Sequence, residues 1–92
     1  MLTGLEGDWQ VERTGGFLPP LIGVRKRIEG DRGWTSVGPF PGLPFDVVGS
    51  ELRYRAPFNG VVDVLEPSSD GYRGRALVFG REVGTFRLLR RR

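Results

Sequence analysis

Few side chains of this sequence could take part in chemistry. The 92 residues include no cysteine and no histidine, which excludes thiolate nucleophiles, iron–sulfur clusters, Cys- or His-ligated metals and Ser-His-Asp triads. Asp63 and Glu66 are an odd number of residues apart, so they cannot share one strand face as paired catalytic carboxylates would. We therefore expect no catalytic residue, no metal and no cofactor, and hydrolysis is not expected.

Lys26 is the one lysine of the sequence, and it lies in an alternating stretch. Val24, Lys26 and Ile28 fall on one face, while Arg25 and Arg27 fall on the other. If the apolar face is interior, Lys26 is an inward ammonium that could pair with a ligand carboxylate or act as an amine of lowered pKa. The simpler interpretation, which the sequence favours, places Lys26 near the strand end with its ammonium reaching water.

Arginines recur at i, i+2 spacing in the pairs Arg53/Arg55 and Arg73/Arg75. Each pair shares a strand face and could bind a carboxylate or phosphate through bidentate forks. The alternative is a solvated outer face, which is favoured for the first pair because apolar residues take the inner face. For the second pair the sequence does not decide which strand face is interior, since a turn at 80–81 would place Arg75 opposite Phe86. The acidic residues available across strands are Glu12, Glu51, Asp63 and Glu66.

The elements that position these residues are strands. Apolar and polar residues alternate with a period of two, and 15 glycines with 7 prolines argue against long helices. The proline-rich stretch 38–44 is expected to be a loop, because proline cannot donate a ladder hydrogen bond. Tight turns are expected at 49–50 and 80–81. The predicted strands are 8–14, 21–29, 33–37, 45–48, 51–56, 61–65, 72–79 and 82–90.

Eight strands joined by short connections favour an all-β fold, a small antiparallel up-and-down β-barrel in a single domain of residues 1–92. A β-sandwich or a barrel of fewer strands is the alternative, and 90–92 is expected to be a frayed arginine tail. Connections after odd-numbered strands gather at one end of such a barrel, and that end is apolar, whereas the other end is polar. The apolar residues of the end formed by these connections are Phe17, Leu18, Phe40, Leu43, Phe45 and Phe58.

Apolar loops need a physical reason. They could fold inward and plug the barrel, cover a pocket, form a homodimer contact, or touch a membrane surface; the last ranks lowest because no basic residues flank them. We predict a non-catalytic site for a small hydrophobic or amphipathic molecule, with Lys26 as an orienting charge. A homodimer through the same loops, without a ligand, is the alternative. The ligand-binding residues are then Phe17, Leu18, Phe40, Leu43, Phe45, Phe58 and Lys26.

The two termini carry a family pattern. Gly7-Asp8-Trp9 heads the first strand, and the last strand ends in 86–90. This pairing resembles the calycins, the superfamily of lipocalins and fatty-acid-binding proteins. The resemblance implies that Trp9 lies at the closed end of the barrel beneath a basic residue, Arg90 or Arg87, with structural roles, and that 14–20 folds across the mouth. The chain is far shorter than typical members, so a shallow lumen or none is expected. An isomerase or cyclase of the calycin kind, working by shape, stays open.

Charge and hydropathy restrict the partners. Without Arg90–Arg92 the remaining 11 basic residues match the 11 acidic ones, so no unpaired basic stripe exists and nucleic acid is not expected as a partner. No apolar run approaches the length of a membrane span. The first residues lack the basic and apolar regions of a signal peptide, so a cytoplasmic location is expected.

Overall fold

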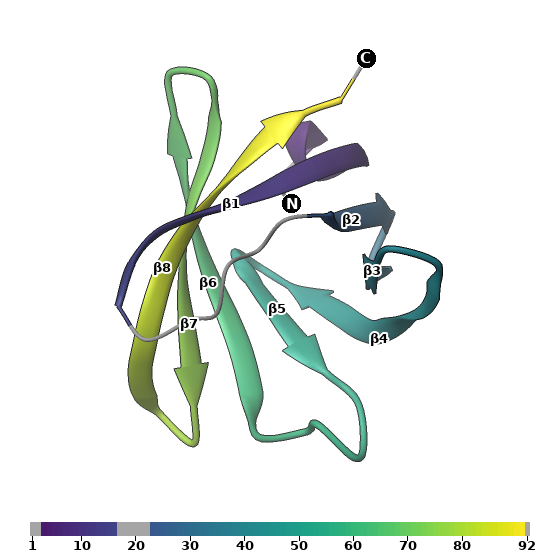
Figure 1. Ribbon diagram of the computed structural model, residues 1–92, viewed down its shortest axis with the longest axis vertical. Helices are drawn as coiled ribbons and strands as arrows, with labels where there is room; N and C mark the ends of the chain where they lie inside the picture. The colour runs from purple at the N-terminus through teal and green to yellow at the C-terminus, as the bar shows by residue number, and fades with distance from the viewer. Residues whose placement is uncertain (1–2, 17–22, 92) are drawn as a thin grey trace.

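In the computed structural model of the chain, the described residues are 3–16 and 23–91, and they form an all-β barrel. Each strand pairs antiparallel with the next, and β8 pairs with β1, so the sheet closes in sequence order (Figure 1). The only helix among these residues is η1 (Thr3–Leu5), and no described helix could cross a membrane. The strands are β1 (Gly7–Gly16), β2 (Val24–Glu29), β3 (Arg32–Val37), β4 (Phe40–Val48), β5 (Glu51–Tyr54), β6 (Val61–Ser68), β7 (Gly71–Val78) and β8 (Arg81–Arg90).

The predicted up-and-down barrel is thereby confirmed. The β5–β6 and β7–β8 connections lie at one end of the molecule and the β6–β7 connection lies at the other (Figure 1). The predicted apolar residues Phe17 and Leu18 lie outside the described residues, as does the side chain of Phe40.

The prediction of a loop at 38–44 is wrong, because β4 begins at Phe40. On one side, residues 40–46 pair with β3, with Pro44 opposite Trp34. On the other side, the ladder with β5 ends where Phe45 pairs with Tyr54. Positions 40–44 therefore have no paired strand on that side, and a missing proline N–H removes no ladder bond there.

The β7–β8 turn is displaced by one residue from its predicted place. Phe79 and Gly80 form it, with φ angles of 49° and 81°, and two successive positive φ angles are typical of a type I′ hairpin. The ladder between β7 and β8 is also interrupted by a bulge at Ala76 and Leu77, just before the turn. Gly74 consequently lies opposite Phe86, and Arg75 lies opposite Thr85.

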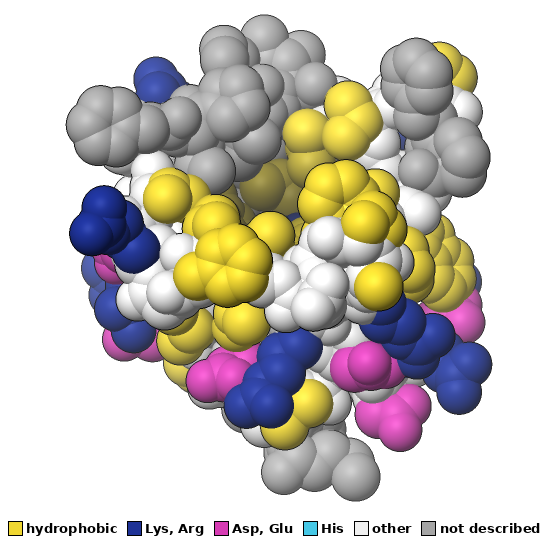
Figure 2. All heavy atoms as spheres, turned by 90° about the horizontal axis from the view of Figure 1, so that it is seen from below, with side chains coloured by type: hydrophobic (Ala, Val, Ile, Leu, Met, Phe, Trp, Pro, Cys, Tyr) yellow, Lys and Arg dark blue, Asp and Glu magenta, His cyan; other side chains and the backbone are white. Residues whose placement is uncertain are grey.

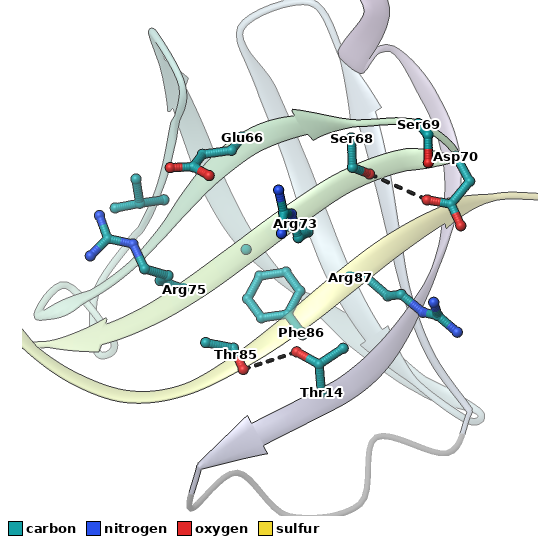
Figure 3. A pocket seen from close by; sticks show the side chains of 12 residues that line it. Thr14, Glu66, Ser68, Ser69, Asp70, Arg73, Arg75, Thr85, Phe86 and Arg87 are labelled. Atoms are coloured by element: carbon teal, nitrogen blue, oxygen red, sulfur yellow. Dashed lines mark hydrogen bonds between the residues drawn. The ribbon is translucent and has the colours of Figure 1, made fainter.

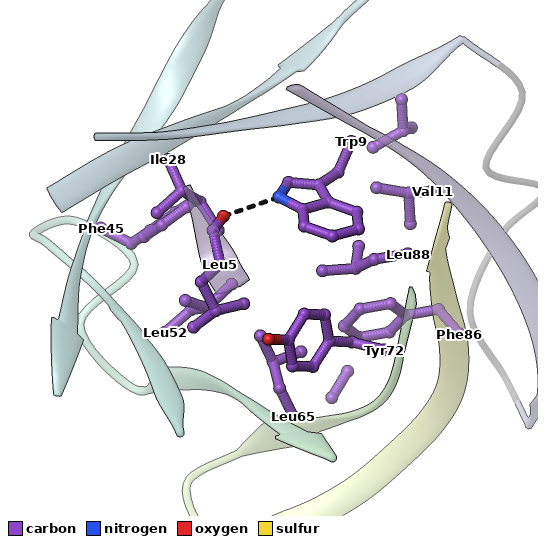
Figure 4. Close-up of a cluster of buried hydrophobic side chains, with 12 residues drawn as sticks. Leu5, Trp9, Val11, Ile28, Phe45, Leu52, Leu65, Tyr72, Phe86 and Leu88 are labelled. Atoms are coloured by element: carbon purple, nitrogen blue, oxygen red, sulfur yellow. Dashed lines mark hydrogen bonds between the residues drawn. The ribbon is translucent and has the colours of Figure 1, made fainter. Parts of the chain in front are cut away.

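The polar end is closed by a packed cluster around Trp9 (Figure 4). Trp9 is 1% exposed, and its indole Nε1 donates to the carbonyl of Leu5 at 2.7 Å. The Tyr72 ring meets it edge to face, with centroids 5.5 Å apart. Leu5 thus acts as a plug that the indole holds in the bottom of the barrel.

Arg90 covers this cluster from outside. Its guanidinium carbon lies 4.2 Å from the Trp9 ring centroid, and its two terminal nitrogens donate to the carbonyls of Glu6 at 2.9 Å and Gly4 at 2.7 Å. Arg90 belongs to β8, and the Arg91 N–H donates to the Asp8 carbonyl at 3.0 Å. One side chain therefore joins the last strand, the first strand and the segment that precedes it.

Removing this side chain should destabilise the fold. We expect Arg90→Ala to lower the free energy of unfolding by about 1–3 kcal/mol, because a cation–π contact and two charge-assisted hydrogen bonds disappear. Urea denaturation measures the change. Arg91→Ala is the matched control and should stay within about 0.5 kcal/mol of the parent. Equal losses in the two variants would contradict the specific role of Arg90.

Candidate ligand-binding cavity

The interior of the barrel contains a buried charged residue from β2. Burial alternates along this strand, so that Val24, Lys26 and Ile28 are buried while Arg25 and Arg27 are exposed. Lys26 is only 4% exposed. The favoured interpretation of an ammonium reaching water is therefore wrong, because Lys26 lies in the middle of its strand, paired with β1 on one side and β3 on the other.

Three oxygens from three other strands surround the Lys26 ammonium. Its Nζ donates to Thr35 Oγ1 of β3 at 2.7 Å and to Tyr54 Oη of β5 at 2.6 Å, and it lies 3.1 Å from Asp63 Oδ2 of β6. Tyr54 Oη in turn donates to Asp63 Oδ2 at 3.1 Å and lies 2.7 Å from Thr35 Oγ1. We call these four side chains the polar floor.

Aromatic rings complete the environment of the ammonium. The Nζ lies 5.5, 5.3 and 5.6 Å from the ring centroids of Phe45, Tyr54 and Phe86, which is within the range of cation–π attraction. Asp63 supplies the opposite charge, and both ionic side chains are at most 6% exposed. Desolvating both ions is expensive, and the hydrogen bonds of the floor offset part of that cost.

The protonation of the polar floor follows from these contacts. Burial by itself lowers the pKa of Lys26, but the charge of Asp63 and the contacts with Tyr54 outweigh it, so the pKa lies above its ordinary value. Burial raises the pKa of Tyr54, with Lys26 opposing and Asp63 adding to the rise. Lys26 is therefore a protonated ammonium and Tyr54 a neutral phenol at neutral pH.

A cavity of about 210 Å³ lies against the polar floor, toward the apolar end of the barrel. Figure 2 shows that end, where apolar side chains gather around a hollow. An engineered cavity of about 150 Å³ already holds benzene, so this one has room for one substituted ring or a short alkyl chain. Apart from the polar floor, its walls come from Val11, Val24, Leu43, Phe58, Val61, Ala76 and Phe86.

The predicted site residues divide between wall, floor and core. Leu43 and Phe58 line the cavity, and Lys26 belongs to its floor. Phe45, which was expected at the mouth, is instead fully buried and packs edge to face against Tyr54. Arg87 does not reach Trp9, since its guanidinium binds Glu12 at 2.8 and 3.0 Å.

Sequence reasoning missed the acidic partner of Lys26. The sequence suggested Asp63 only as one of four possible partners for arginines on an outer face, yet it is 4% exposed. The sequence did contain a signal for this. One face of β6 is formed by every second residue, Val61, Asp63 and Leu65, and its two apolar members indicate that this face is interior. Tyr54 could be placed by the same alternation with Leu52, but its contact with Lys26 depends on the register of strands far apart in the sequence.

A second, larger hollow lies on the outer face of β6, β7 and β8 (Figure 3). Arg73 and Arg75 line it, which settles that this arginine face of β7 is external. Gly74 takes the inward position between them, and any Cβ there would overlap the Phe86 ring. The charges in the hollow are largely balanced within the protein, because Arg75 lies 3.6 Å from Glu82 and Arg87 binds Glu12. The internal cavity is therefore the stronger candidate.

Comparison with known proteins assigns no family to this geometry. No protein-family model, no curated protein and no solved structure matches the chain. The closed antiparallel barrel of eight strands is compatible with a calycin-like fold.

The ion pair should be strongly coupled. We expect Lys26→Met and Asp63→Leu each to destabilise the protein by about 3–5 kcal/mol, because each leaves one buried charge unpaired. The double variant should recover most of this loss, as measured by a double-mutant cycle in urea. The exposed pair of Arg55 and Asp46, 2.6 Å apart, is the control and should show no measurable coupling. Additive losses at Lys26 and Asp63 would contradict the proposed pairing.

Stability should fall at alkaline pH. The unfolded chain releases the Tyr54 and Lys26 protons near pH 10 to 10.4, whereas the folded protein holds them to higher pH because both pKa values are raised. The stabilisation is therefore complete below about pH 10 and is lost as pH rises through the folded values. Urea midpoints between pH 8 and 12 test this. A fall of equal size in a variant carrying Lys26→Met, Asp63→Leu and Tyr54→Phe would assign the effect elsewhere.

Proposed function

We propose that this protein binds one small apolar or amphipathic molecule, without transforming it, in the cavity above the polar floor. The observation that carries the proposal is the cavity itself: about 210 Å³ of space, walled by apolar side chains, inside a barrel of only 92 residues. Binding sites for small molecules are concave and lined mostly by apolar side chains, with a few polar groups that orient the ligand. A hollow of this size on one side of a tightly packed core favours an occupant.

The energetics fit a weakly held small ligand. Burying one apolar side chain contributes about 1.5–3 kcal/mol, and a dissociation constant of 1 mM corresponds to about 4.1 kcal/mol. A single ring that fills the cavity should therefore bind with millimolar to high-micromolar affinity. A ligand that also contacts Leu43 and Phe58 at the rim would bind more tightly.

The polar floor favours binding over catalysis. A nucleophilic lysine must be deprotonated, but Lys26 is held as an ammonium by Asp63 and has its pKa raised. The Tyr54 phenol is held neutral in the same way. These groups orient one another, so we assign them a structural and recognition role.

We further propose that the chain is a very short member of the calycin superfamily. The closed meander of eight strands supports this assignment, as does the guanidinium of Arg90 over the buried indole of Trp9. A cytoplasmic location remains a prediction from the sequence.

A homodimer through the apolar end is the second candidate. The observation that favours it is Phe79, which is 86% exposed at the tip of the β7–β8 turn, beside a 44% exposed Phe58. A bulky residue with positive φ is conformationally costly, and contact with a second copy of the chain would bury its exposed ring. The ring lies over Gly60, whose missing Cβ makes room for it.

Filling the cavity should abolish binding. We expect Val61→Phe, on the inner face of β6, to remove the saturable binding of toluene, because the added ring occupies the hollow that Val61 lines. The matched control is Val62→Phe, which places the same ring on the outer face of the same strand. Backbone amide shifts at Thr35 and Ala76 during toluene titration provide the measurement.

The parent protein decides between the two candidates. Toluene shifts confined to the cavity wall in a monomer support the binding function. Native mass spectrometry or sedimentation that finds a dimer, lost on Phe79→Ser and unaffected by Val61→Phe, would favour the homodimer. The absence of any saturable toluene shift in the parent would overturn the binding proposal.

A further inference from the structure

We propose that the ligand of this cavity is uncharged and brings a hydrogen-bond donor at its inner end, which the unpaired carboxylate oxygen of Asp63 accepts. The ligand class is therefore a small phenol, alcohol or similar N–H or O–H compound, and not a carboxylic acid. This inference rests on the proposed function and specifies its chemistry.

The hydrogen-bond donors of the polar floor are directed mainly at oxygens of the floor itself. Lys26 carries three N–H protons, and three oxygens lie within 3.1 Å of its Nζ. The Tyr54 hydroxyl donates to Asp63 Oδ2, so in its 2.7 Å contact with Thr35 the threonine hydroxyl is the donor. Two ammonium protons of Lys26 and both hydroxyl protons are thereby hydrogen-bonded within the floor, and the charge of the ammonium is paired with Asp63.

One acceptor in the floor is still open. Lys26 and Tyr54 both engage Oδ2 of Asp63, and within residues 3–16 and 23–91 no hydrogen bond reaches Oδ1. If Oδ1 were fully buried, it would be a buried oxygen without a hydrogen-bond partner, and these residues contain no such atom. Oδ1 therefore keeps some accessible surface, and because Asp63 lines the cavity, that surface faces the hollow.

The charge balance excludes an anionic ligand. Lys26 and Asp63 cancel each other, so the floor carries no net charge for a carboxylate to neutralise. A carboxylate in the cavity would lose its hydration, find no free donor and meet the open oxygen of Asp63, and both effects oppose binding. The sequence-based expectation that Lys26 pairs with a ligand carboxylate is therefore replaced by the opposite polarity.

A neutral donor meets all of these conditions. A hydroxyl group on a ring can donate to Oδ1 while the ring contacts Val61, Ala76 and Phe86 of the wall. A hydrogen bond to an ionised acceptor is stronger than one between neutral groups. An apolar molecule of the same shape would fill the same space but leave Oδ1 without a partner and without water.

The test compares three probes on the intact protein at pH 7: phenol, toluene and benzoate. Phenol and toluene have nearly the same shape and differ in one hydroxyl group. We expect phenol to bind about tenfold more tightly than toluene, although toluene is the more hydrophobic. Benzoate should produce no saturable shift of the Val61 and Ala76 amides.

A second protein variant tests whether the floor causes this preference. The double variant Lys26→Met with Asp63→Leu removes both charges and the open oxygen, and leaves the hydroxyls of Thr35 and Tyr54, which lie 2.7 Å apart and bond to each other. We expect the order to reverse, so that toluene binds more tightly than phenol. The matched control is Arg55→Met with Asp46→Leu on the outer face, which should keep the phenol preference of the parent. The parent titrations alone decide the inference if the floor variant does not fold.

The outcomes separate the two proposals. If toluene binds as tightly as phenol, or if benzoate binds more tightly than either, the inference fails while the binding function stands. If none of the three probes binds in the cavity, the binding function itself fails. A phenol preference that persists in the floor variant would also overturn the inference, because the hydroxyl would then find its acceptor elsewhere.

Discussion

The buried pair of Lys26 and Asp63 is the constraint around which the interior is organised. A barrel this small turns about every second residue of each strand inward, and among the described residues two of the buried ones, Lys26 and Asp63, are ionic. The cost of their desolvation is offset by their mutual attraction and by hydrogen bonds, which Thr35 and Tyr54 supply from two further strands. The pair therefore fixes the relative register of four strands and divides the interior into a packed half around Trp9 and a hollow half toward the loops.

Two inward glycines allow this arrangement. Gly33 and Gly74 face the rings of Phe45 and Phe86, and a Cβ at either position would overlap the ring that covers it. Those two rings flank the Lys26 ammonium. Where a side chain would normally reach toward the barrel axis, an aromatic ring lies against the wall instead. Each missing Cβ thus gives one of the two rings room to lie beside the ammonium.

The sequence predicts the architecture well and the site only in part. Alternation of period two identifies the strands, their number and the barrel. It also places Lys26 and Asp63 on inner faces, once the apolar residues beside them are taken to mark the interior face of each strand. It does not show that they meet, because their contact depends on closure across the barrel. The prolines of β4 led to the wrong prediction of a loop, because a strand accepts proline where it has no paired neighbour, and this depends on where β5 ends. At Arg75 a one-residue displacement of the β7–β8 turn, combined with a bulge, exchanges the residue facing Phe86.

The separation of the two halves explains how so small a domain can keep a hollow. At the polar end Arg90, Trp9 and Leu5 close the barrel through contacts that involve none of the loops at the opposite end. Fully buried side chains and their hydrogen bonds are concentrated there and in the polar floor, whereas Leu43 and Phe58 at the rim are 36% and 44% exposed. The floor is held on strand interiors, which position side chains more rigidly than loops do. In the proposed function, ligand selection falls to the one acceptor of the floor that the packing leaves open.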